Sequence, residues 1–359
     1  MKVLFYIQTM SGGGAARLLS LIANELVKRG YEVIIANNLH VKIAYQLSDR
    51  IKLLPLYRED SYNKSRISRF LSQLSIAREI AKEQRPDVII SMLPPVSFYT
   101  YLATLGLHIP IIFCDVTSYA RKDSPFVHFV RYHFYKLADA VTVQTENDRK
   151  ILGKRIPRKV VINNPLSFPS FQAEIQRRKT ILSIGHTSEW QIKGMDILIR
   201  SFARIAKSHP EWDVEIAGGT TPESLGYLNR LIAQNGVEGR IKFIGFQDRI
   251  ELKMREVSIF ALPSRVEGFS LALTEALSQG CSAVAFKING VITDVTGNGH
   301  GTLLAEDYDE RQFADNLDKL MSSEELRKKL ASDGREFVKK YDITTIGSQW
   351  EALIRRITK

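Results

Sequence analysis

Short apolar runs alternate with longer amphipathic runs along most of this chain. The first repeat of the pattern is an apolar run at 2–9, a glycine-rich turn, a run at 15–29 and another apolar run at 32–37. Apolar residues within 15–29 recur every three or four positions, which is the spacing of a helix with one buried face. The shorter runs have no polar face, as is typical of strands in a parallel sheet. The pattern predicts the α/β class.

The same alternation starts again after a break at 167–176, a stretch near two prolines with few aliphatic residues. A chain of 359 residues is long for a single core. We therefore expect two Rossmann-like domains, 1–166 and 177–342, joined by a linker at 167–176. Residues 343–359 read as a last helix.

One stretch of the second half combines a strand, a loop and a helix. The apolar run 259–264 predicts a buried strand, and the run 271–278 predicts a helix that Gly280 ends. Glu267 then lies in the loop before this helix, and Glu275 lies about one turn inside it.

The backbone amides between these two glutamates are the unpaired donors of a helix N-terminus, which is a ready site for phosphate. They belong to residues around Phe269, Ser270 and Leu271. Two carboxylates with an anion site between them suit a ligand that has hydroxyls at both ends and phosphate in the middle. A nucleotide-sugar fits that description.

Residues 260–276 resemble the Glu-x7-Glu signature of the retaining glycosyltransferases of family 4, the glycosyl transferases group 1. The resemblance implies a GT-B fold, with two Rossmann-like domains facing across a cleft and the helix of 343–359 crossing back onto the first. It implies transfer of a sugar from a nucleotide-diphospho-sugar to an acceptor hydroxyl with retention of configuration, with UDP as the first expectation for the carrier and GDP as the alternative. Two other readings stay open: a nucleotide-sugar epimerase on the same architecture, and a non-catalytic member that binds a glycan.

The resemblance also implies roles for single residues. Glu267 contacts the sugar hydroxyls beside the anomeric carbon, Glu275 holds the ribose, and Lys193 holds the diphosphate together with the helix amides. Asp115 stands near the place where the family has a histidine close to the sugar, and is expected to be catalytic. Further donor-binding positions are Gly13, Gly14, His186, Gly245, Phe246, Gly268, Phe269, Ser270, Leu271, Asn289 and Gly290. The family usually has arginine where this chain has His186.

No cofactor and no metal are expected, because a lysine ammonium can neutralise a departing diphosphate. The single Asp-x-Asp triplet, Asp307 to Asp309, does not follow an apolar strand and indicates a solvated helix start. Cys114 and Cys281 lie in apolar contexts far apart, which gives no support for a disulfide or a zinc site.

The charge is uneven. Residues 1–170 hold 24 Lys and Arg against 13 Asp and Glu, a net of +11, and the remainder holds 26 of each. This asymmetry indicates contact with an anionic surface. Because no nucleic-acid motif is present, we expect no nucleic-acid partner and favour an acidic lipid surface.

The run 65–85 reads either as an ordinary surface helix or as a basic helix, with Arg66, Arg69 and Arg78, that touches membrane or a lipid-linked acceptor. No signal peptide and no apolar span of about 18 residues are evident. We therefore expect a cytoplasmic enzyme, peripherally associated with the inner face of the membrane, that acts on a lipid-linked or cell-surface glycan.

Overall fold

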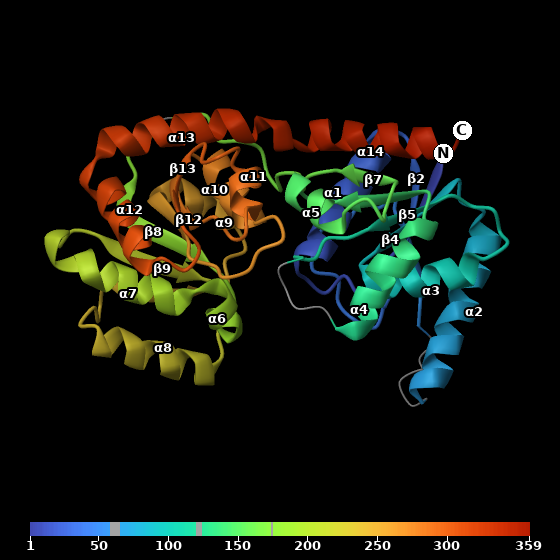
Figure 1. Ribbon diagram of the computed structural model, residues 1–359, viewed down its shortest axis with the longest axis horizontal. Coiled ribbons are helices and arrows are strands. Elements are labelled where there is room, and N and C mark those ends of the chain that lie inside the picture. Colours follow the sequence, from blue (N-terminus) through green and yellow to red (C-terminus); the bar gives the residue numbers. More distant parts are fainter. Residues whose placement is uncertain (58–64, 120–123, 174) are drawn as a thin grey trace. The chain divides into compact units, whose positions relative to one another are not determined.

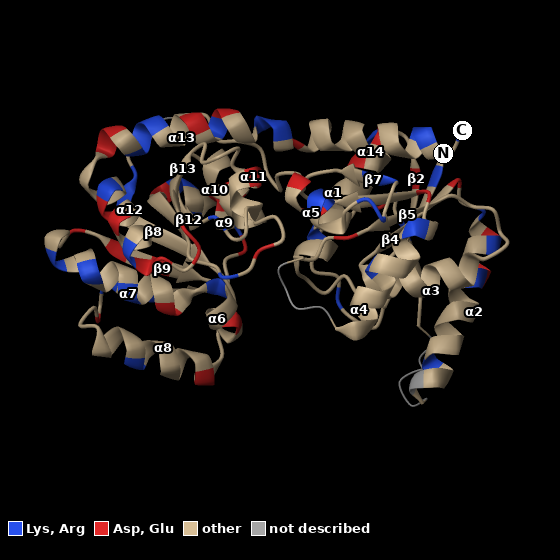
Figure 2. Cartoon of the chain, viewed as in Figure 1, with Lys and Arg blue, Asp and Glu red and all other residues tan. Residues whose placement is uncertain are grey.

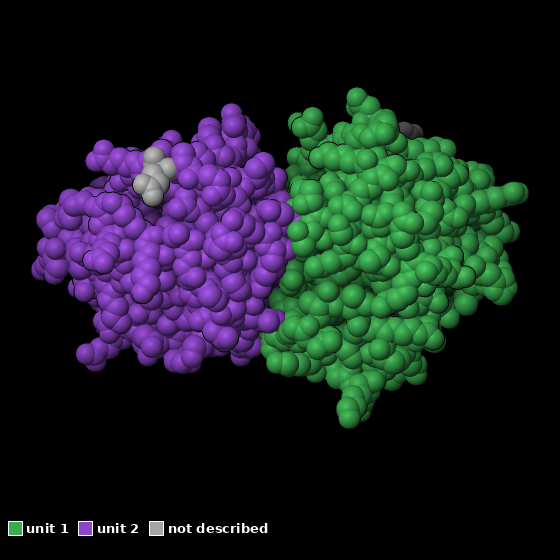
Figure 3. Space-filling view, turned by 90° about the horizontal axis from the view of Figure 1, so that it is seen from above, with its two compact units in different colours: residues 1–165, 343–359 green, residues 166–342 purple. Residues whose placement is uncertain are grey.

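The computed structural model describes residues 1–57, 65–119, 124–173 and 175–359. The chain divides into two compact units, one made of 1–165 with 343–359 and the other of 166–342 (Figure 3). Each unit is built around one parallel β-sheet with helices packed on it (Figure 1). The predicted α/β class is therefore confirmed.

The first unit contains a seven-stranded sheet in the order β3-β2-β1-β4-β5-β6-β7. Its strands are β1 (Lys2–Tyr6), β2 (Glu32–Asn37), β3 (Lys52–Pro55), β4 (Val88–Met92), β5 (Ile111–Cys114), β6 (Ala140–Val143) and β7 (Lys159–Val161). All neighbours run parallel. Strand order reverses direction between β1 and β4, which makes that junction the topological switch point of the sheet.

Helices bury both faces of this sheet. The helices are α1 (Gly14–Lys28), α2 (Arg66–Gln84), α3 (Pro94–Thr104), α4 (Pro125–Phe129), α5 (Glu146–Leu152) and α14 (Ile343–Ile357). Val3 and Phe5 of β1 belong to an apolar cluster that contains residues of α1 and α14, whereas Leu4 and Tyr6 belong to a cluster with residues of α2 and α3. The period of two along a strand accounts for this division. Trp350 of α14 is buried, so the last helix is part of the first unit's core.

The second unit contains a six-stranded parallel sheet in the order β10-β9-β8-β11-β12-β13. Its strands are β8 (Arg178–Ile184), β9 (Asp213–Ala217), β10 (Ile241–Gly245), β11 (Val257–Leu262), β12 (Ser282–Phe286) and β13 (Thr302–Ala305). Its helices are α6 (Trp190–Lys193), α7 (Met195–Ile205), α8 (Pro222–Gln234), α9 (Ile250–Glu256), α10 (Leu271–Ser278), α11 (Val291–Val295), α12 (Glu310–Ser322) and α13 (Glu324–Val338). Basic and acidic positions alternate along α13 (Figure 2). The switch point of this sheet lies between β8 and β11.

Some elements are absent from the sequence prediction. The apolar pattern does not predict the strands β3, β12 and β13, and it does not predict the helix α3. Helix α3 begins with Pro94 and Pro95, where a missing amide costs no helical hydrogen bond. Most of its residues are buried, so no polar face interrupts the apolar run and no helical period appears.

Candidate functional site

The switch point of the second sheet brings together two loops that carry predicted site residues. The chain leaves β8 through Gly185 and His186, and it leaves β11 through residues 263–270. Because β8 and β11 are parallel neighbours, both loops emerge at the same edge of the sheet. Ligands of open α/β sheets bind at this kind of place.

Lys193 ends the short helix α6, and two glycines fix its position. Gly194 has a left-handed φ of 64°, and a Cβ on it would lie 1.9 Å from the carbonyl oxygen of Pro263. A Cβ on Gly185 would lie 2.8 Å from Cγ of Lys193. The absence of these side chains lets the Lys193 stem lie against the end of β8 and next to the loop after β11.

Lys193 and Glu267 form an ion pair, with Nζ 3.0 Å from Oε1. The side chain of Glu267 is 10% exposed and that of Lys193 is 26% exposed. Burial by itself lowers the pKa of Lys193, but the charge and hydrogen bond of Glu267 outweigh it and raise the pKa above its ordinary value. The pair therefore presents a permanent ammonium and a carboxylate side by side at the switch point.

A second ion pair holds the two loops together. Arg265 makes two hydrogen bonds of 2.8 Å to the oxygens of Asp196, in the first turn of α7. The backbone amide of Arg265 donates to the carbonyl of Ile192 at 2.7 Å. Burial raises the pKa of Asp196, but Arg265 and Arg200 outweigh it and hold that pKa below its ordinary value. No local pattern predicts this clamp, which ties the loop that carries Glu267 to the residues on either side of Lys193.

We expect Gly194→Ala to disturb the site more than a matched change elsewhere. Gly236 has nearly the same φ, 65°, but a Cβ there meets no atom within 4 Å among the described residues. Gly236→Ala should cost only the left-handed strain, about 1–2 kcal/mol. Gly194→Ala adds the clash with Pro263, so it should unfold at lower urea and weaken UDP binding about 10-fold or more by moving Lys193. Equal stability and equal UDP affinity in the two variants would contradict this account.

The helix α10 begins and ends where the sequence predicts. Ser270 precedes it in a left-handed conformation, with φ 66°. The hydroxyls of Ser264 and Ser270 are buried, and neither has a hydrogen-bond partner among the described residues. The ring of Phe269 is buried edge-on against Tyr341, so only its backbone is available to a ligand. The start of α10 therefore offers amides and two unpaired hydroxyls.

Glu275 lies inside α10 and is 2% exposed. Its Oε1 accepts a hydrogen bond of 2.5 Å from Ser167, and the amide of Phe171 donates to the carbonyl of Ser278 at 2.9 Å. Residues 167 and 171 fall within the stretch expected to be a linker, and they pack on α10. The ribose role of Glu275 stays a prediction.

The loops after β8 and β10 carry the next predicted positions. His186 Nδ1 accepts from the amide of Ser188 at 3.2 Å, and its ring lies where a Cβ on Gly219 would be, 2.5 Å from Cδ2. Gly245 has φ 69°, and the ring of Phe246 after it is 77% exposed. The exposed ring of Phe246 is accessible for stacking on a base.

Asn289 and Gly290 form a left-handed turn after β12, with φ 50° and 85°. The carboxylate of Asp307 accepts from the amides of Ile288 at 2.5 Å and Asn289 at 2.7 Å, so it holds this turn. Asp309 caps α12. The Asp-x-Asp triplet is thus used for backbone contacts, and for Asp309 the predicted helix start is confirmed. The expectation that no apolar strand precedes the triplet is wrong, because β13 ends at Ala305.

Gly13, Gly14 and Asp115 belong to the first unit. Gly13 and Gly14 are exposed at the start of α1, and Gly13 has φ 83°. A Cβ on either would meet no described atom within 4 Å. The turn therefore leaves open space above the helix start.

Asp115 follows β5 and lies in a buried network. Arg131 contacts both of its oxygens, with Nε at 2.8 Å and Nη2 at 3.1 Å. Tyr119 and Tyr135 donate their hydroxyls to Oδ2 at 2.8 and 2.9 Å, and Thr117 donates to Oδ1. Asp115 is 1% exposed. Every oxygen of Asp115 is occupied by protein donors, which favours a structural role, and the catalytic role that the resemblance implies stays a prediction.

Asp115→Asn should destabilise the first unit by about 3–5 kcal/mol, because it leaves the buried guanidinium of Arg131 without its counter-charge. Urea unfolding would measure this loss. UDP binding to the folded variant should be unchanged. Wild-type stability combined with loss of turnover would instead restore a catalytic role for Asp115.

Comparison with protein families gives two matches along the chain. Residues 12–167 match the family described as Glycosyltransferase Family 4, and residues 168–337 match Glycosyl transferases group 1. An uncharacterized glycosyltransferase of Haemophilus influenzae is 25% identical, covering 98% of this chain and 99% of its own. An N-acetyl-D-galactosaminyltransferase of Campylobacter jejuni, whose name gives a PP-undecaprenol-linked glycan, is 27% identical with 99% of each chain covered.

Among solved structures, HepE of Anabaena in complex with UDP and glucose is similar, with a TM-score of 0.79 and 18% identity. The likeness covers 99% of this chain and 100% of that one. Together with the two parallel sheets, it confirms the expected GT-B fold.

Proposed function

Because this chain belongs to the group 1 glycosyltransferases, we propose that it transfers a sugar from a nucleotide-diphospho-sugar, first of all a UDP-sugar, to a hydroxyl of a glycan acceptor. We propose that the anomeric configuration is retained. The observation that carries the proposal is the ion pair of Lys193 and Glu267 at the switch point of the second sheet. The ammonium of Lys193 suits the diphosphate, and the carboxylate of Glu267 suits the sugar.

In this proposal the bond between the anomeric carbon and the β-phosphate oxygen breaks with its electrons moving onto the phosphate. Lys193 and the first amides of α10 stabilise the negative charge that develops there. Glu267 contacts the sugar, where positive charge builds up. The acceptor oxygen attacks from the face that the phosphate leaves, and its proton passes to a phosphate oxygen. Lys193 supplies the charge that a metal supplies in other transferases, so we propose no metal cofactor.

We propose that the acceptor is a lipid-linked or cell-surface glycan. We also propose that the enzyme associates with the anionic surface of the membrane's inner face. The name of the Campylobacter relative supports the acceptor class.

On α2, Ile67 is 75% exposed and Leu71 is 58% exposed, and they lie one turn apart. Arg78 donates to the carbonyls of Ala103 and Leu105, so it joins α2 to the end of α3. The described side chains do not include Arg66. No helix of the described residues has the length and apolarity needed to span a bilayer.

Binding to acidic liposomes should depend on Ile67 and Leu71. Changing both to Ser should strongly reduce co-sedimentation, since burying each apolar side chain is worth about 1.5–3 kcal/mol. Wild-type binding should also fall as salt rises, because each basic group near an anionic bilayer adds about 1 kcal/mol. Ile151→Ser, at an exposed position of α5, is the matched control. Wild type that ignores acidic liposomes at low salt, or a double variant that binds equally well, would refute membrane docking.

A panel of nucleotide-sugars tests the function as a whole. A UDP-sugar should raise the melting temperature, and incubation with a lipid-linked acceptor should give a product whose anomeric configuration, read by NMR, equals that of the donor. Conversion of the donor without acceptor would identify an epimerase. Donor binding without turnover on any acceptor would identify a non-catalytic member.

A further inference from the structure

The turn after β12 has a backbone conformation that its residues rarely adopt. Ile288 and Asn289 have φ angles of 51° and 50°, in the left-handed region, and Gly290 follows with φ 85°. A β-branched residue in this region is an outlier, and each such conformation costs free energy. Strained residues of this kind persist only where the surrounding structure holds them, and they gather at ligand sites. The turn therefore needs a group that holds it.

Asp307 is that group. Its Oδ1 accepts a hydrogen bond from the amide of Ile288 at 2.5 Å, and its Oδ2 accepts one from the amide of Asn289 at 2.7 Å. Hydrogen bonds to an ionised acceptor are stronger than those between neutral groups. Asp307 belongs to the loop after β13, which pairs in parallel with β12. The carboxylate therefore ties together two neighbouring loops at the carboxyl edge of the second sheet.

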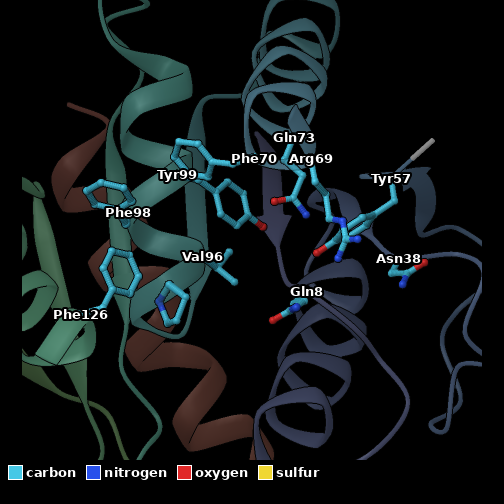
Figure 4. A pocket seen from close by; sticks show the side chains of 11 residues that line it. Gln8, Asn38, Tyr57, Arg69, Phe70, Gln73, Val96, Phe98, Tyr99 and Phe126 are labelled. Atoms are coloured by element: carbon cyan, nitrogen blue, oxygen red, sulfur yellow. The ribbon is translucent and has the colours of Figure 1, made fainter. Parts of the chain in front are cut away.

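Side chains at such an edge need not join the loops in this way. In the first unit, Gln8, Asn38 and Tyr57 follow the neighbouring strands β1, β2 and β3, and their side chains line a pocket of about 330 Å³ (Figure 4). The bond of one carboxylate to two successive amides is thus a feature of Asp307 and of the turn opposite it, and not a general consequence of a parallel sheet.

The turn lies one strand away from the loop that carries Glu267. Because β11 and β12 are parallel neighbours, the turn and the loop 263–270 leave the sheet at the same edge. Ile288 is 2% exposed, whereas Asn289 is exposed. The buried isoleucine anchors the turn in the core, and the carboxamide of Asn289 is the group that the turn presents. A carboxamide both donates and accepts hydrogen bonds, which suits the neutral hydroxyls of a sugar.

We propose that Asp307 is a positioning residue of the donor site, which holds the turn of Ile288, Asn289 and Gly290 in its left-handed form so that the turn contacts the sugar of a nucleotide-sugar. The proposal rests on the glycosyltransferase function proposed above. Asp307 itself does not touch the donor, because both of its oxygens face the turn. A turn that is already held loses less conformational freedom when a ligand binds, so the clamp should strengthen binding of the sugar.

Asp307→Asn tests this role by calorimetry. Asparagine keeps one acceptor, but its amide group brings a donor against a backbone N–H, so the turn should open. The probes are UDP, UDP-glucose, UDP-galactose, UDP-N-acetylglucosamine and UDP-N-acetylgalactosamine. For the UDP-sugar that wild type binds most tightly, the variant should weaken binding about 5- to 10-fold. Its affinity for UDP should stay at the wild-type value.

Asp309→Asn is the matched control. The carboxylate of Asp309 also accepts from a backbone amide, that of Gln312 at 2.9 Å, but it caps α12. This variant should lose stability and still keep the wild-type ratio of the two affinities, which a merely structural role of Asp307 would also leave unchanged. Hydrogen exchange gives a second readout, because the amides of Ile288 and Asn289 should exchange faster in Asp307→Asn and at the wild-type rate in Asp309→Asn.

Exchange in wild type needs no variant. The amides of Ile288 and Asn289 should exchange slowly, and the turn should become still slower with the UDP-sugar but not with UDP. Fast exchange of both amides, or a turn that no UDP-sugar slows, overturns the proposal even if Asp307→Asn does not fold.

The binding data separate this proposal from the proposed function. Equal losses for UDP and the UDP-sugar in Asp307→Asn, or the same selective loss in Asp309→Asn, overturn the positioning role alone. A wild type that binds UDP but none of the four UDP-sugars overturns it as well. Failure of UDP and of all four UDP-sugars to bind wild type overturns the proposed function.

Discussion

Glu267→Gln is expected to lower kcat about 100- to 1,000-fold while leaving UDP bound. Glutamine keeps the size and the hydrogen-bonding ability of the side chain but removes the charge that faces Lys193 at 3.0 Å. Loss of an interaction made mainly in the transition state lowers kcat more than it raises KM. UDP should bind at least as tightly as to wild type, because Lys193 then has no internal carboxylate to compete with the diphosphate.

Steady-state kinetics and calorimetry measure the two effects separately. Glu256→Gln is a matched control, because this glutamate is also paired with basic residues of the second unit but is 48% exposed. It should have wild-type kcat. A kcat of Glu267→Gln within a few-fold of wild type would remove Glu267 from the chemistry.

Lys193→Met is expected to weaken UDP about 10- to 100-fold and to leave uridine unaffected, since hydrogen bonds to charged groups are worth about 1.5–3 kcal/mol. Methionine preserves the stem that lies against Gly185 and removes only the ammonium. Lys179→Met, at an exposed position of β8 paired with Glu211, is the control and should bind both ligands normally. Equal losses for UDP and uridine would show that Lys193 does not contact the diphosphate.

The pKa of Lys193 sets the pH range of this effect. It is raised in the folded protein, so the ion pair contributes stability below the unfolded-state pKa of 10.5, and that contribution is lost as pH rises through the higher folded-state pKa. UDP affinity should therefore keep its Lys193 dependence throughout the neutral range. In Glu267→Gln the burial of Lys193 is opposed only by the smaller effect of the Glu189 charge, and the pKa of Lys193 should fall.

The local pattern of apolar residues predicts the strand and the helix that form the switch point of the second sheet. The helix α10 appears where the apolar run and Gly280 predict it, and β11 begins and ends two residues before the predicted strand of 259–264. The contact between Lys193 and Glu267 is different, because 74 positions separate them. The parallel pairing of β8 with β11 and the clamp from Arg265 to Asp196 bring the two side chains together.

The structure refines two expectations for the first unit: it confirms the helix of 65–85 as α2 (Arg66–Gln84) but limits its buried face, and it surrounds Asp115 with protein donors. The helical period of 65–85 predicts a continuous apolar face, but only its second half, including Ala77 and Ala81, is buried, and Ile67 is exposed. Periodicity marks a face without saying how far the neighbouring elements extend along it. No local signal in the sequence shows that Arg131, 16 positions later, pairs with Asp115.

A crystal structure of the protein with UDP bound is the measurement that tests the central claim most directly. The account predicts the β-phosphate at about 2.7–2.9 Å from Nζ of Lys193, beside the first amides of α10, with Glu267 facing the space that the sugar occupies. UDP bound elsewhere, with the contact between Lys193 and Glu267 intact at 3.0 Å, would contradict it.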